Sequence, residues 1–530
     1  MSTFLTTLFA IAVAALPVDI PFERGDRMPD FSRVGYRWGD VEIPTVKVVK
    51  KLKAPKDGSD ATALIQDAID GMKKPGAILL TAGTYNVGGP INIKKSGVVL
   101  RGEGQDKTIL VCTGTAQRTF INIDSGANRA LDEKHRAKVT DAYVPFGALS
   151  FNVDNPWQFR VGDRVVVRRP STKKWLHDIR MDQIPQFFDT YGIVVRQWQP
   201  GQVDILFERT ISGIEGNTIF LDNPVTYALD AQYGGGEVIR CRFDRLQECG
   251  VENLKLVSEF DDSKKSHVTY QGKVEEYFSD EQHGWIAIRF ARAEHCWVRN
   301  VTTQYFGYSH TAMGIYAKNI TVKDCTCLDP VSRLHGSRRY AFATAGCELC
   351  LVKDCVMDKD RHGCVTNGRT PGPNVYTRCR VTHAYSDSGP HNRLGICTLY
   401  DALYIEGSLD VQDRAGSGHG HGWAGANMVF WNCDCRDIVC QGLWASATNY
   451  CIGCTGKKRS GWFGQGSHEE YKGRFVGGLD PGFEERPDGV WVSHGKHVEP
   501  ESLYDWQYAQ RKAAGEKAVP EPCYKSIWNK

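Results

Sequence analysis

The sequence has few features of a membrane or nucleic-acid-binding protein. Its one long apolar run covers residues 4–16 and is shorter than the roughly 20 residues that cross a bilayer. Lys and Arg total 65 against 62 Asp and Glu, a formal net charge of +3. That balance is unlike the strongly basic surface of a dedicated nucleic-acid binder. We therefore expect neither a membrane nor a nucleic acid as a partner.

The apolar run is typical of a secretory signal peptide. It ends near Ala12-Val13-Ala14, small residues of the kind found at cleavage sites. No Lys or Arg precedes the run, so a buried N-terminal strand or helix is the alternative. We assign residues 1–16 to the signal peptide and expect a secreted, extracellular protein.

Cysteines are abundant and gathered in one region. Fourteen of the 18 lie between Cys296 and Cys454. In an extracellular protein they suit disulfides, and buried thiols stacked in a core are the alternative. The Cys-x-x-Cys pairs at 347–350 and 451–454 have the spacing of zinc ligands, but they lie 100 residues apart. We therefore expect no metal there.

A short motif recurs along the middle of the chain and indicates a solenoid. It consists of an apolar residue, a variable residue, then Asn, Asp or Arg, then an apolar residue or Cys. The aligned last positions are Leu254, Val301, Cys325, Cys355, Cys379, Cys433 and Cys454. The gaps of 47, 24, 30, 24, 54 and 21 residues suggest a unit of about 24, with two units each in the gaps of 47 and 54. Such short units bury their apolar sides only by stacking.

The N-terminal region supplies a resemblance. Residues 57–70 predict a short amphipathic helix with Asp60 as N-cap, and residues 77–104 read as short strands broken by glycine. This order, followed by the repeats, resembles the pectin-lyase-like superfamily. The resemblance implies an all-β fold, a right-handed parallel β-helix whose N-terminal helix caps the open end.

The remaining segments complete the expected organisation. Residues 131–245 interrupt the repeat and read as a small inserted β subdomain, and the pattern is lost again near the C-terminus. The expected parts are a cap with the first rungs over 17–130, the insertion over 131–245, the main β-helix over 246–475, and a tail packed on the solenoid over 476–530.

Candidate site residues concentrate in residues 331–423. Six of the 15 histidines fall in this sixth of the chain, where two or three would be expected by chance. Each cluster follows or interrupts a repeat, so loops on one face of a rigid scaffold are expected to carry it. The predicted catalytic residues are Tyr340, His362, His391, Arg393, His419 and His421. The predicted substrate-binding residues are Arg338, Arg339, Arg361, Asp387, Arg414 and Trp423.

These residue types suit cleavage of an acidic polysaccharide by β-elimination. An arginine can pair with the uronate carboxylate, one histidine can act as base, and a second histidine or Tyr340 can act as acid. Calcium could replace the arginine, but no dense Asp/Glu cluster of that type is present in residues 331–423. We therefore predict no cofactor, and an anionic polysaccharide as the partner of a monomer.

Two alternatives remain open. Gly418-His419-Gly420 resembles an element of polygalacturonase-type hydrolases, although the paired Asp-Asp of those enzymes is missing. Hydrolysis would need two carboxyl groups that converge in space. The other alternative is a carbohydrate-binding β-helix without catalytic activity.

Overall fold

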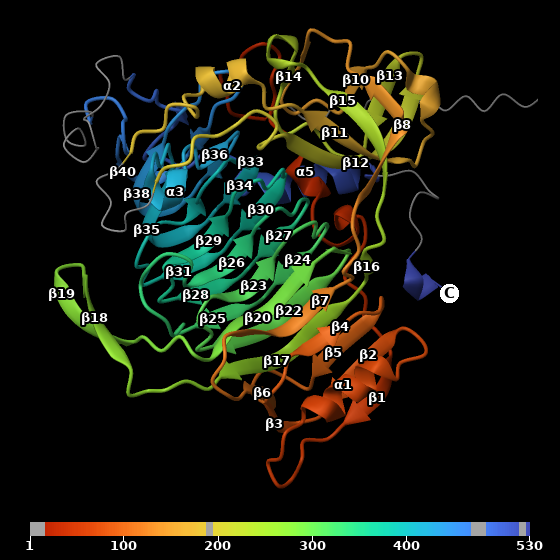
Figure 1. Cartoon of the computed structure of the whole chain (residues 1–530), viewed down its shortest axis with the longest axis vertical. Helices are drawn as coiled ribbons and strands as arrows, with labels where there is room; N and C mark the ends of the chain where they lie inside the picture. The colour runs from red at the N-terminus through yellow and green to blue at the C-terminus, as the bar shows by residue number, and fades with distance from the viewer. Residues whose placement is uncertain (1–15, 187–193, 468–483, 519–525, 530) are drawn as a thin grey trace, which may run out of the picture.

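The computed structural model describes residues 16–186, 194–467, 484–518 and 526–529. Most of these residues form a parallel β-helix, in agreement with the predicted fold class (Figure 1). Its rungs are short strands that pair in parallel with the rungs before and after them. Parallel crossovers in one sheet are almost always right-handed. The predicted signal peptide lies, except for Leu16, outside the described residues.

One long column of strands runs the length of the solenoid. Its residues pair in register from Trp297 through Thr321, Leu351, Val375, Leu399, Val429 and Tyr450 to Val490. The strands of this column are β17 (Gly250–Ser258), β22 (Trp297–Gln304), β24 (Thr321–Lys323), β27 (Leu351–Lys353), β30 (Asn374–Thr377), β34 (Thr398–Asp401), β37 (Val429–Trp431), β39 (Tyr450–Ile452) and β41 (Val490–Val492). Strand β41 adds a further rung within the segment expected to be the tail.

Two further columns complete the rungs. Beside the first column lie β25 (Thr326–Leu328), β28 (Val356–Asp358), β31 (Arg380–Thr382), β35 (Tyr404–Val411), β38 (Asp434–Cys440) and β40 (Thr455–Lys458). A separate seven-stranded sheet contains β4 (Ile91–Ile93), β7 (Arg118–Asp124), β20 (Gly284–Ala291), β23 (Ser309–Met313), β26 (Tyr340–Thr344), β29 (His362–Thr366) and β32 (Gly389–Pro390). The candidate site is built at this third column.

The structure confirms most of the repeat and corrects one gap. The gap of 54 residues holds two units, because Leu403 fills the position between Cys379 and Cys433 in the ladder. The gap of 47 residues holds one unit, because Leu254 pairs directly with Val301. The extra residues form an antiparallel arm, β18 (Lys265–Tyr270) and β19 (Lys273–Phe278), that projects from the solenoid (Figure 1). An inserted hairpin can thus match the length of a rung.

The repeated cysteines point into the core as free thiols. All 17 cysteines that the structure describes are free, and 16 of them are buried. The thiols of Cys325, Cys355 and Cys379 donate to backbone carbonyls at 3.2, 3.3 and 3.5 Å. Of the two arrangements left open by the sequence, the structure therefore contains stacked buried thiols. The disulfide prediction is wrong for the described cysteines.

The N-terminal helix forms as expected. Helix α1 (Thr62–Asp70) buries Ile65, Ala68 and Ile69 against the first strands. Its N-cap is Ala61, while Asp60 accepts hydrogen bonds from the backbone and hydroxyl of Thr62 at 2.9 and 2.6 Å. The first strands are β1 (Val48–Leu52), β2 (Gly76–Leu80), β3 (Gly83–Val87), β5 (Val98–Gly102) and β6 (Thr108–Cys112).

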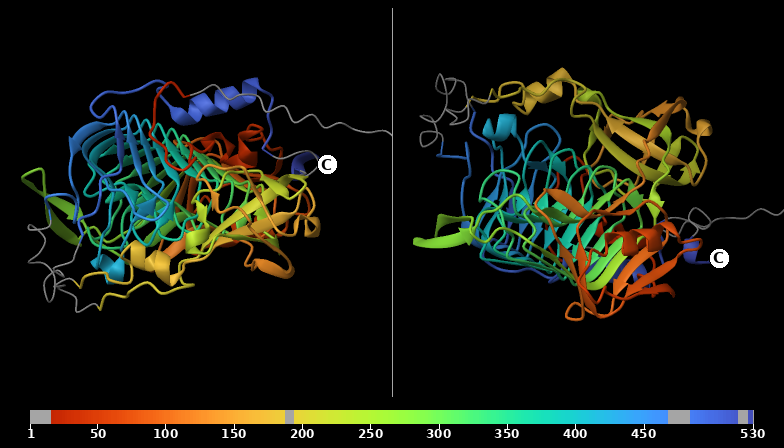
Figure 2. Two further views of the ribbon diagram at one scale, coloured as in Figure 1. Left: turned by 90° about the horizontal axis from the view of Figure 1, so that it is seen from above. Right: turned by 60° about the horizontal axis from the view of Figure 1, so that its bottom comes forward.

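Between β7 and β17 the chain leaves the solenoid and forms a six-stranded antiparallel sheet that lies over one flank of it (Figures 1 and 2). Buried ion pairs join the two parts, with Arg209 on Glu348 at 2.8 Å and Glu208 on Lys318 at 3.5 Å. The strands of this sheet are β8 (Ala130–Lys138), β10 (Ser150–Asn152), β11 (Arg164–Arg169), β12 (Ile205–Glu215), β13 (Thr218–Leu221) and β15 (Glu237–Arg242).

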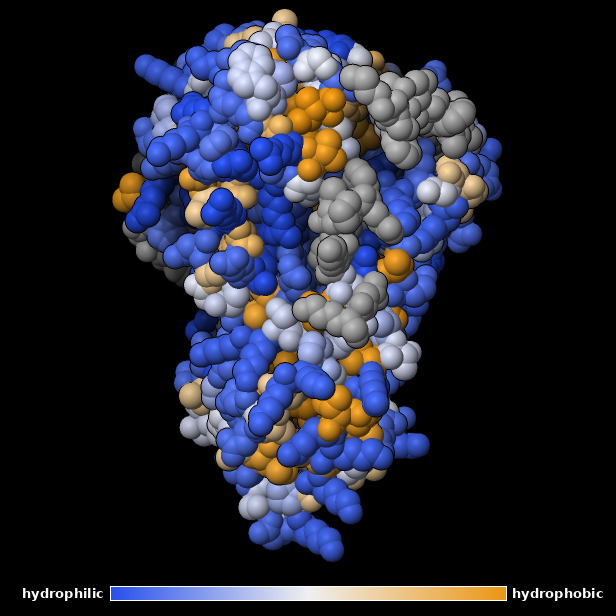
Figure 3. All heavy atoms as spheres, turned by 90° about the vertical axis from the view of Figure 1, so that its right-hand side faces the viewer, coloured by the Kyte–Doolittle hydropathy of each residue, from blue (hydrophilic) through white to orange (hydrophobic). Residues whose placement is uncertain are grey.

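The outer surface is largely polar. Helix α5 (Leu503–Ala513) packs on the solenoid beside the N-terminal turn at Phe31–Arg33. From the side, polar side chains cover most of the visible face and apolar ones gather in small patches (Figure 3). Among the described residues, no helix has the length and apolar character needed to cross a membrane.

Candidate active site

The site is built where polar side chains lie at the ends of strands in neighbouring rungs. Tyr340 opens β26 and His362 opens β29, and the two residues are paired in the parallel ladder. His391 directly follows β32 in the next rung. His421 lies just after the short helix α3 (Ser417–Gly420), with its ring 5.1 Å from that of His391. The structure thus brings together four of the six residues predicted to be catalytic.

A chain of hydrogen bonds links the buried rings to a carboxylate. Arg414 Nη1 donates to His391 Nδ1 at 3.0 Å and to Asp387 Oδ2 at 3.2 Å. Because a guanidinium can only donate, His391 carries its proton on Nε2 and donates it to the Tyr340 hydroxyl oxygen at 3.0 Å. The hydroxyl hydrogen of Tyr340 is left for another acceptor.

Three buried polar atoms in this cluster have no hydrogen-bond partner among the described residues. His362 donates from Nδ1 to the Asp387 carbonyl at 2.5 Å, and its Nε2 has no partner. His421 Nδ1 and Arg361 Nη1 are likewise buried without partners. Buried polar atoms without partners also occur elsewhere in this structure, but here three of them lie in one cluster and are free to bind a ligand.

The imidazoles of the cluster are neutral near pH 7. Burial lowers the pKa of His362 to about 3 and that of His421 to about 3. Burial and the nearby Arg414 lower the pKa of His391 well below its usual value. A neutral imidazole presents one lone pair, which at His362 is the unpartnered Nε2.

An open cavity lies on the solvent side of this buried cluster. It has a volume of about 620 Å³ and is lined by Asp387, Asp410, Arg414, Arg459 and Trp462, together with Gln412, Lys457 and Lys458. We call it the carboxylate cleft. Tyr340, His362 and His391 are only 3%, 1% and 5% exposed and do not line it. In the cleft, Lys457, Lys458 and Arg459 are exposed, Asp387 and Arg414 are partly buried, and Asp410 is 6% exposed.

Asp387 and Asp410 occupy adjacent rungs but have opposite pKa shifts. Burial by itself raises the pKa of Asp387, but opposing effects, the charge of Arg414 first among them, hold the pKa well below its usual range. Burial, reinforced by the charge of Asp387, raises the pKa of Asp410 to about 7. A pair of carboxyl groups separated in this way provides one base and one acid at neutral pH.

Asp410 was missed in the sequence, although a signal was present. It lies 23 residues after Asp387, close to the repeat of about 24. The backbone of Asp410 donates to Ser388 at 3.0 Å, which places the two acids on neighbouring rungs. An acid one repeat after another acid was therefore the pattern to look for.

The structure places several predicted site residues elsewhere. Arg338 forms an ion pair with Glu281 at 2.6 Å. Arg339 is 2% exposed and donates to the backbone carbonyls of Ser332 and Phe278, so it supports loops. Trp423 is fully buried and donates to the Ile179 carbonyl at 3.0 Å, which excludes sugar stacking.

Two more predicted catalytic residues lie outside the buried cluster. His419 is exposed, and the described hydrogen bonds and ring contacts of the cluster do not include it. Arg393 lines a different cavity. Position 418 requires glycine, because its φ is 50° and a Cβ there would lie 2.1 Å from Cε1 of His421.

The cluster contains one possible set of metal ligands. Ligand atoms of His362, Asp387 and His391 lie within 4.8 Å of one another, and two imidazoles with a carboxylate suit a transition metal. Arg414 Nη1 already donates to both His391 and Asp387, so a guanidinium holds the cation position. Arg414 would have to leave for a metal to bind.

Comparisons with known proteins do not assign this chain to a family. No family model matches, and no curated protein is similar. Among solved structures, the Geobacillus virus E2 protein ORF18 has a TM-score of 0.36 at 11% identity, over 78% of this chain and 58% of that one. An alginate lyase from Paenibacillus sp. str. FPU-7 has a TM-score of 0.34 at 7% identity, over 85% of this chain and 100% of that one.

A viral protein with a bound sugar is also among the similar structures. The tailspike protein of Escherichia coli bacteriophage HK620, in complex with a pentasaccharide, has a TM-score of 0.39 at 11% identity. The match covers 83% of this chain and 58% of the tailspike. The chain thus spans little more than half the length of these two viral proteins, and the likenesses concern architecture alone.

Proposed function

We propose that this protein is a glycoside hydrolase that cleaves an anionic polysaccharide in the carboxylate cleft. One observation carries the proposal: Asp387 and Asp410 line the same open cavity from adjacent rungs, and their pKa values are shifted in opposite directions. Two carboxyl groups in different protonation states are what glycosidic hydrolysis requires.

The two acids have distinct roles. Asp410, with a pKa near 7, protonates the departing glycosidic oxygen. Asp387 stays ionised beside Arg414 and acts on the sugar ring, either as nucleophile or as the base that activates water. Arg414 keeps Asp387 ionised and thereby prevents both acids from holding protons at once.

The rim of the cleft favours a negatively charged sugar chain. Arg459 and Lys457 are exposed at the edge, and Arg414 lies within. Guanidinium groups bind carboxylate and sulfate groups with two parallel hydrogen bonds. The half-buried Trp462 offers an apolar face on which a sugar ring can pack.

β-Elimination is the second candidate, and the buried cluster favours it. His362 has a free Nε2 lone pair for the C5 proton, Tyr340 retains a hydroxyl hydrogen for the leaving oxygen, and Arg361 has an unpartnered Nη1 for the uronate. This mechanism needs the substrate to enter a cluster that is at most 5% exposed at Tyr340, His362 and His391. Asp410 is itself only 6% exposed, but it lines the open cavity together with Asp387, so we place hydrolysis first.

The products of the reaction separate the two mechanisms. The purified chain is incubated with pectate, alginate, glycosaminoglycans and ulvan, and new reducing ends are counted alongside the ultraviolet absorbance of unsaturated uronates. Hydrolysis gives reducing ends without that absorbance, and elimination gives both. Neither signal on any substrate, combined with retention on the polymer, would favour a binding protein.

Replacement of the proposed acid tests the assignment. Asp410→Asn keeps the size of the side chain but removes the proton, and turnover should fall roughly 10²–10⁴-fold. The matched control is Asp434→Asn on strand β38, whose carboxylate contacts Thr455 and His497 instead of the cleft. Unchanged turnover in Asp410→Asn would remove Asp410 from the mechanism.

We further propose that the protein is secreted and acts as a monomer, since polysaccharides of this class lie outside cells. The proposal rests on the apolar run at residues 4–16. Mass spectrometry of the N-terminus of protein recovered from the culture medium, together with sedimentation analysis, tests it.

A further inference from the structure

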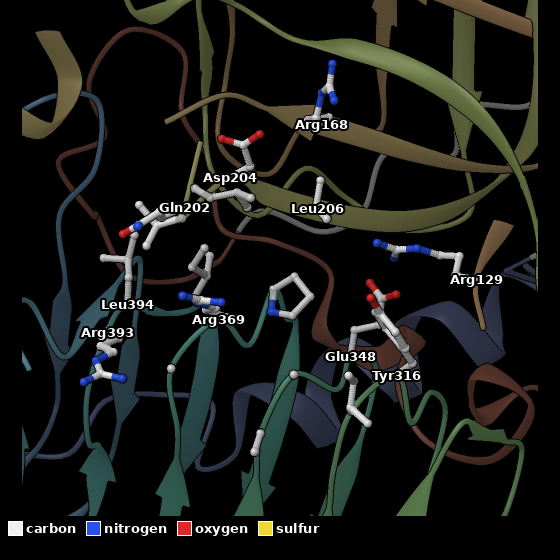
Figure 4. A pocket seen from close by; sticks show the side chains of 18 of the residues that line it. Arg129, Arg168, Gln202, Asp204, Leu206, Tyr316, Glu348, Arg369, Arg393 and Leu394 are labelled. Atoms are coloured by element: carbon white, nitrogen blue, oxygen red, sulfur yellow. The ribbon is translucent and has the colours of Figure 1, made fainter. Parts of the chain in front are cut away.

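A second cavity lies between the inserted sheet and the solenoid (Figure 4). It has a volume of about 540 Å³, and arginines contribute much of its lining: Arg129, Arg168, Arg369 and Arg393. In Figure 4 Arg369 and Arg393 lie on the solenoid side, and Arg168 lies across from them on the inserted sheet. The cavity is formed by segments far apart in the chain.

The acidic side chains of this cavity are already engaged. Asp204 accepts hydrogen bonds from the backbone and hydroxyl of Ser171, both at 2.8 Å. Glu348 is paired with the buried Arg209 at 2.8 Å. Neither Asp204 nor Glu348 forms an ion pair or hydrogen bond with Arg369 or Arg393 among the described residues.

Three arginines have no acidic partner among the described residues, and two of them, Arg369 and Arg393, line the cavity. The three are Arg369, Arg393 and Arg196, of which Arg369 and Arg196 are exposed and Arg393 is partly buried. Arg369 and Arg196 are close enough to act electrostatically on Arg393, and burial together with these two charges lowers the pKa of Arg393. Three like charges placed together repel one another unless an anion binds between them.

The backbone fixes two of these arginines on successive rungs. Arg369 N donates to Arg393 O at 3.2 Å, so the two residues occupy equivalent turns of adjacent rungs, which lie about 4.8 Å apart. Both have positive φ, 59° and 44°, as do many other non-glycine residues at the turns of this solenoid. Gly368 permits the close approach, because a Cβ there would lie 2.8 Å from Cβ of Arg393.

The arginine group connects with the candidate active site. Arg393 N donates to His421 O at 2.9 Å in the next rung, and Arg196 N donates to His419 O at 3.2 Å. The charge of Arg393 also acts on His421, as does that of Arg414 at the carboxylate cleft. Arg369, Arg393, His421 and Arg414 therefore mark a line from the second cavity to the cleft.

We propose that Arg196, Arg369 and Arg393 form an anion-binding subsite, distinct from the acids of the cleft, that holds a carboxylate or sulfate group of the polysaccharide several sugar units from the bond that is cleaved. The identity of the ligand as a polysaccharide rests on the proposed function. The anion site itself rests on the three unpaired charges and the cavity, so it can be measured without turnover.

The test uses the full chain carrying Asp410→Asn, so that binding is measured without cleavage. Titration calorimetry with long and short oligogalacturonate and chondroitin sulfate fragments is compared between this protein and one that also carries Arg369→Ala and Arg393→Ala. The control carries Arg333→Ala, an exposed arginine ion-paired with Glu281. Inorganic sulfate is titrated as a probe of the bare anion site.

Long fragments should bind the double arginine variant about 100-fold more weakly, roughly tenfold for each lost charged contact. Short fragments that fill only the cleft should bind it normally, and Arg333→Ala should match its parent. Weakened sulfate binding with unchanged binding of long fragments would reassign the site to a free anion and overturn the polysaccharide subsite. Equal binding of every probe, or none in the parent, would overturn the proposal.

The proposed function fails on different observations. If the protein without Asp410→Asn cleaves none of the polymers yet long fragments bind through the arginines, the subsite stands and the hydrolase does not. If the protein that keeps Asp410 cleaves a polymer, and Arg369→Ala with Arg393→Ala in that protein leaves the turnover of long fragments unchanged, the hydrolase stands and the subsite does not.

Discussion

The carboxylate cleft and the arginine-lined cavity lie on the same stack of turns but differ in whether their arginines are paired with acids. In the cleft, Asp387 and Asp410 alternate with Arg414 and Arg459, and each charge changes the protonation of its neighbour. In the cavity, Arg369 and Arg393 have no acidic partner among the described residues. Arginines close to acids set pKa values for proton transfer, whereas arginines without an acidic partner provide only attraction. One scaffold can thus separate chemistry from affinity.

Of the replacements that test this difference between the cleft and the cavity, replacement of Arg414 is expected to have the largest effect on turnover. Arg414→Ala leaves Asp387 without its cation and His391 without its donor, so turnover should fall roughly 100-fold. The pKa of Asp387 should rise, which moves the acid limb of the pH–rate profile to higher pH. Profiles of kcat/KM for Arg414→Ala and Arg414→Lys test this, and an unmoved acid limb in both would contradict the role of Arg414.

The next largest effect is expected in the pH dependence of turnover by the unaltered protein. Asp410 must be protonated to act as the acid, and its pKa is raised to about 7. Activity should therefore be retained below pH 7 and fall about tenfold per pH unit above it. A profile flat to pH 9 would show that Asp410 is not the acid. The same raised pKa makes folding less favourable as pH rises through 7, so Tm should be measured in parallel.

Replacement of Tyr340 distinguishes hydrolysis from elimination, and its expected effect is smaller. Tyr340→Phe removes the hydrogen bond from His391, which should cost about 1 kcal/mol of stability. If the cleft performs hydrolysis, turnover should change only a few-fold, because Tyr340 is buried and does not line the cleft. A loss of more than about 100-fold, with folding unchanged by circular dichroism, would move the reaction to the buried cluster.

The smallest effect is expected at Arg338, which the sequence placed in the substrate groove. Its ion pair with Glu281 at 2.6 Å is partly exposed, so Arg338→Ala should cost less than about 1 kcal/mol of stability. Turnover and KM should match those of the parent. A raised KM would show that the sequence-based assignment was correct after all.

The sequence was most informative where one physical constraint repeats. Stacked rungs must present a small or apolar residue inward, so Cys325, Cys355 and Cys379 could be aligned from spacing alone, and the unit of about 24 residues follows from them. The arm at 265–278 could not be recognised, because a hairpin of its length mimics a rung. The third column was also hidden, since its residues do not carry the repeated motif.

The candidate site could be predicted only in part from the sequence, for a related reason. Tyr340, His362, His391 and His421 share a corner because successive rungs stack, and the histidine density pointed there. The burial that distinguishes Trp423 and Arg339 from exposed residues depends on the inserted sheet and the arm, which no local pattern positions. The raised pKa of Asp410 arises from burial next to Asp387, and such coupling between rungs exists only after folding.

The column of unoxidised sulfhydryls inside the solenoid has a practical consequence. With 17 cysteines held as thiols in the folded chain, assembly of the described parts involves no oxidation step and no search among sulfur pairings. A host cytosol rich in glutathione thus offers suitable conditions for producing the protein, and oxidative refolding would introduce cross-links that the native coil does not contain.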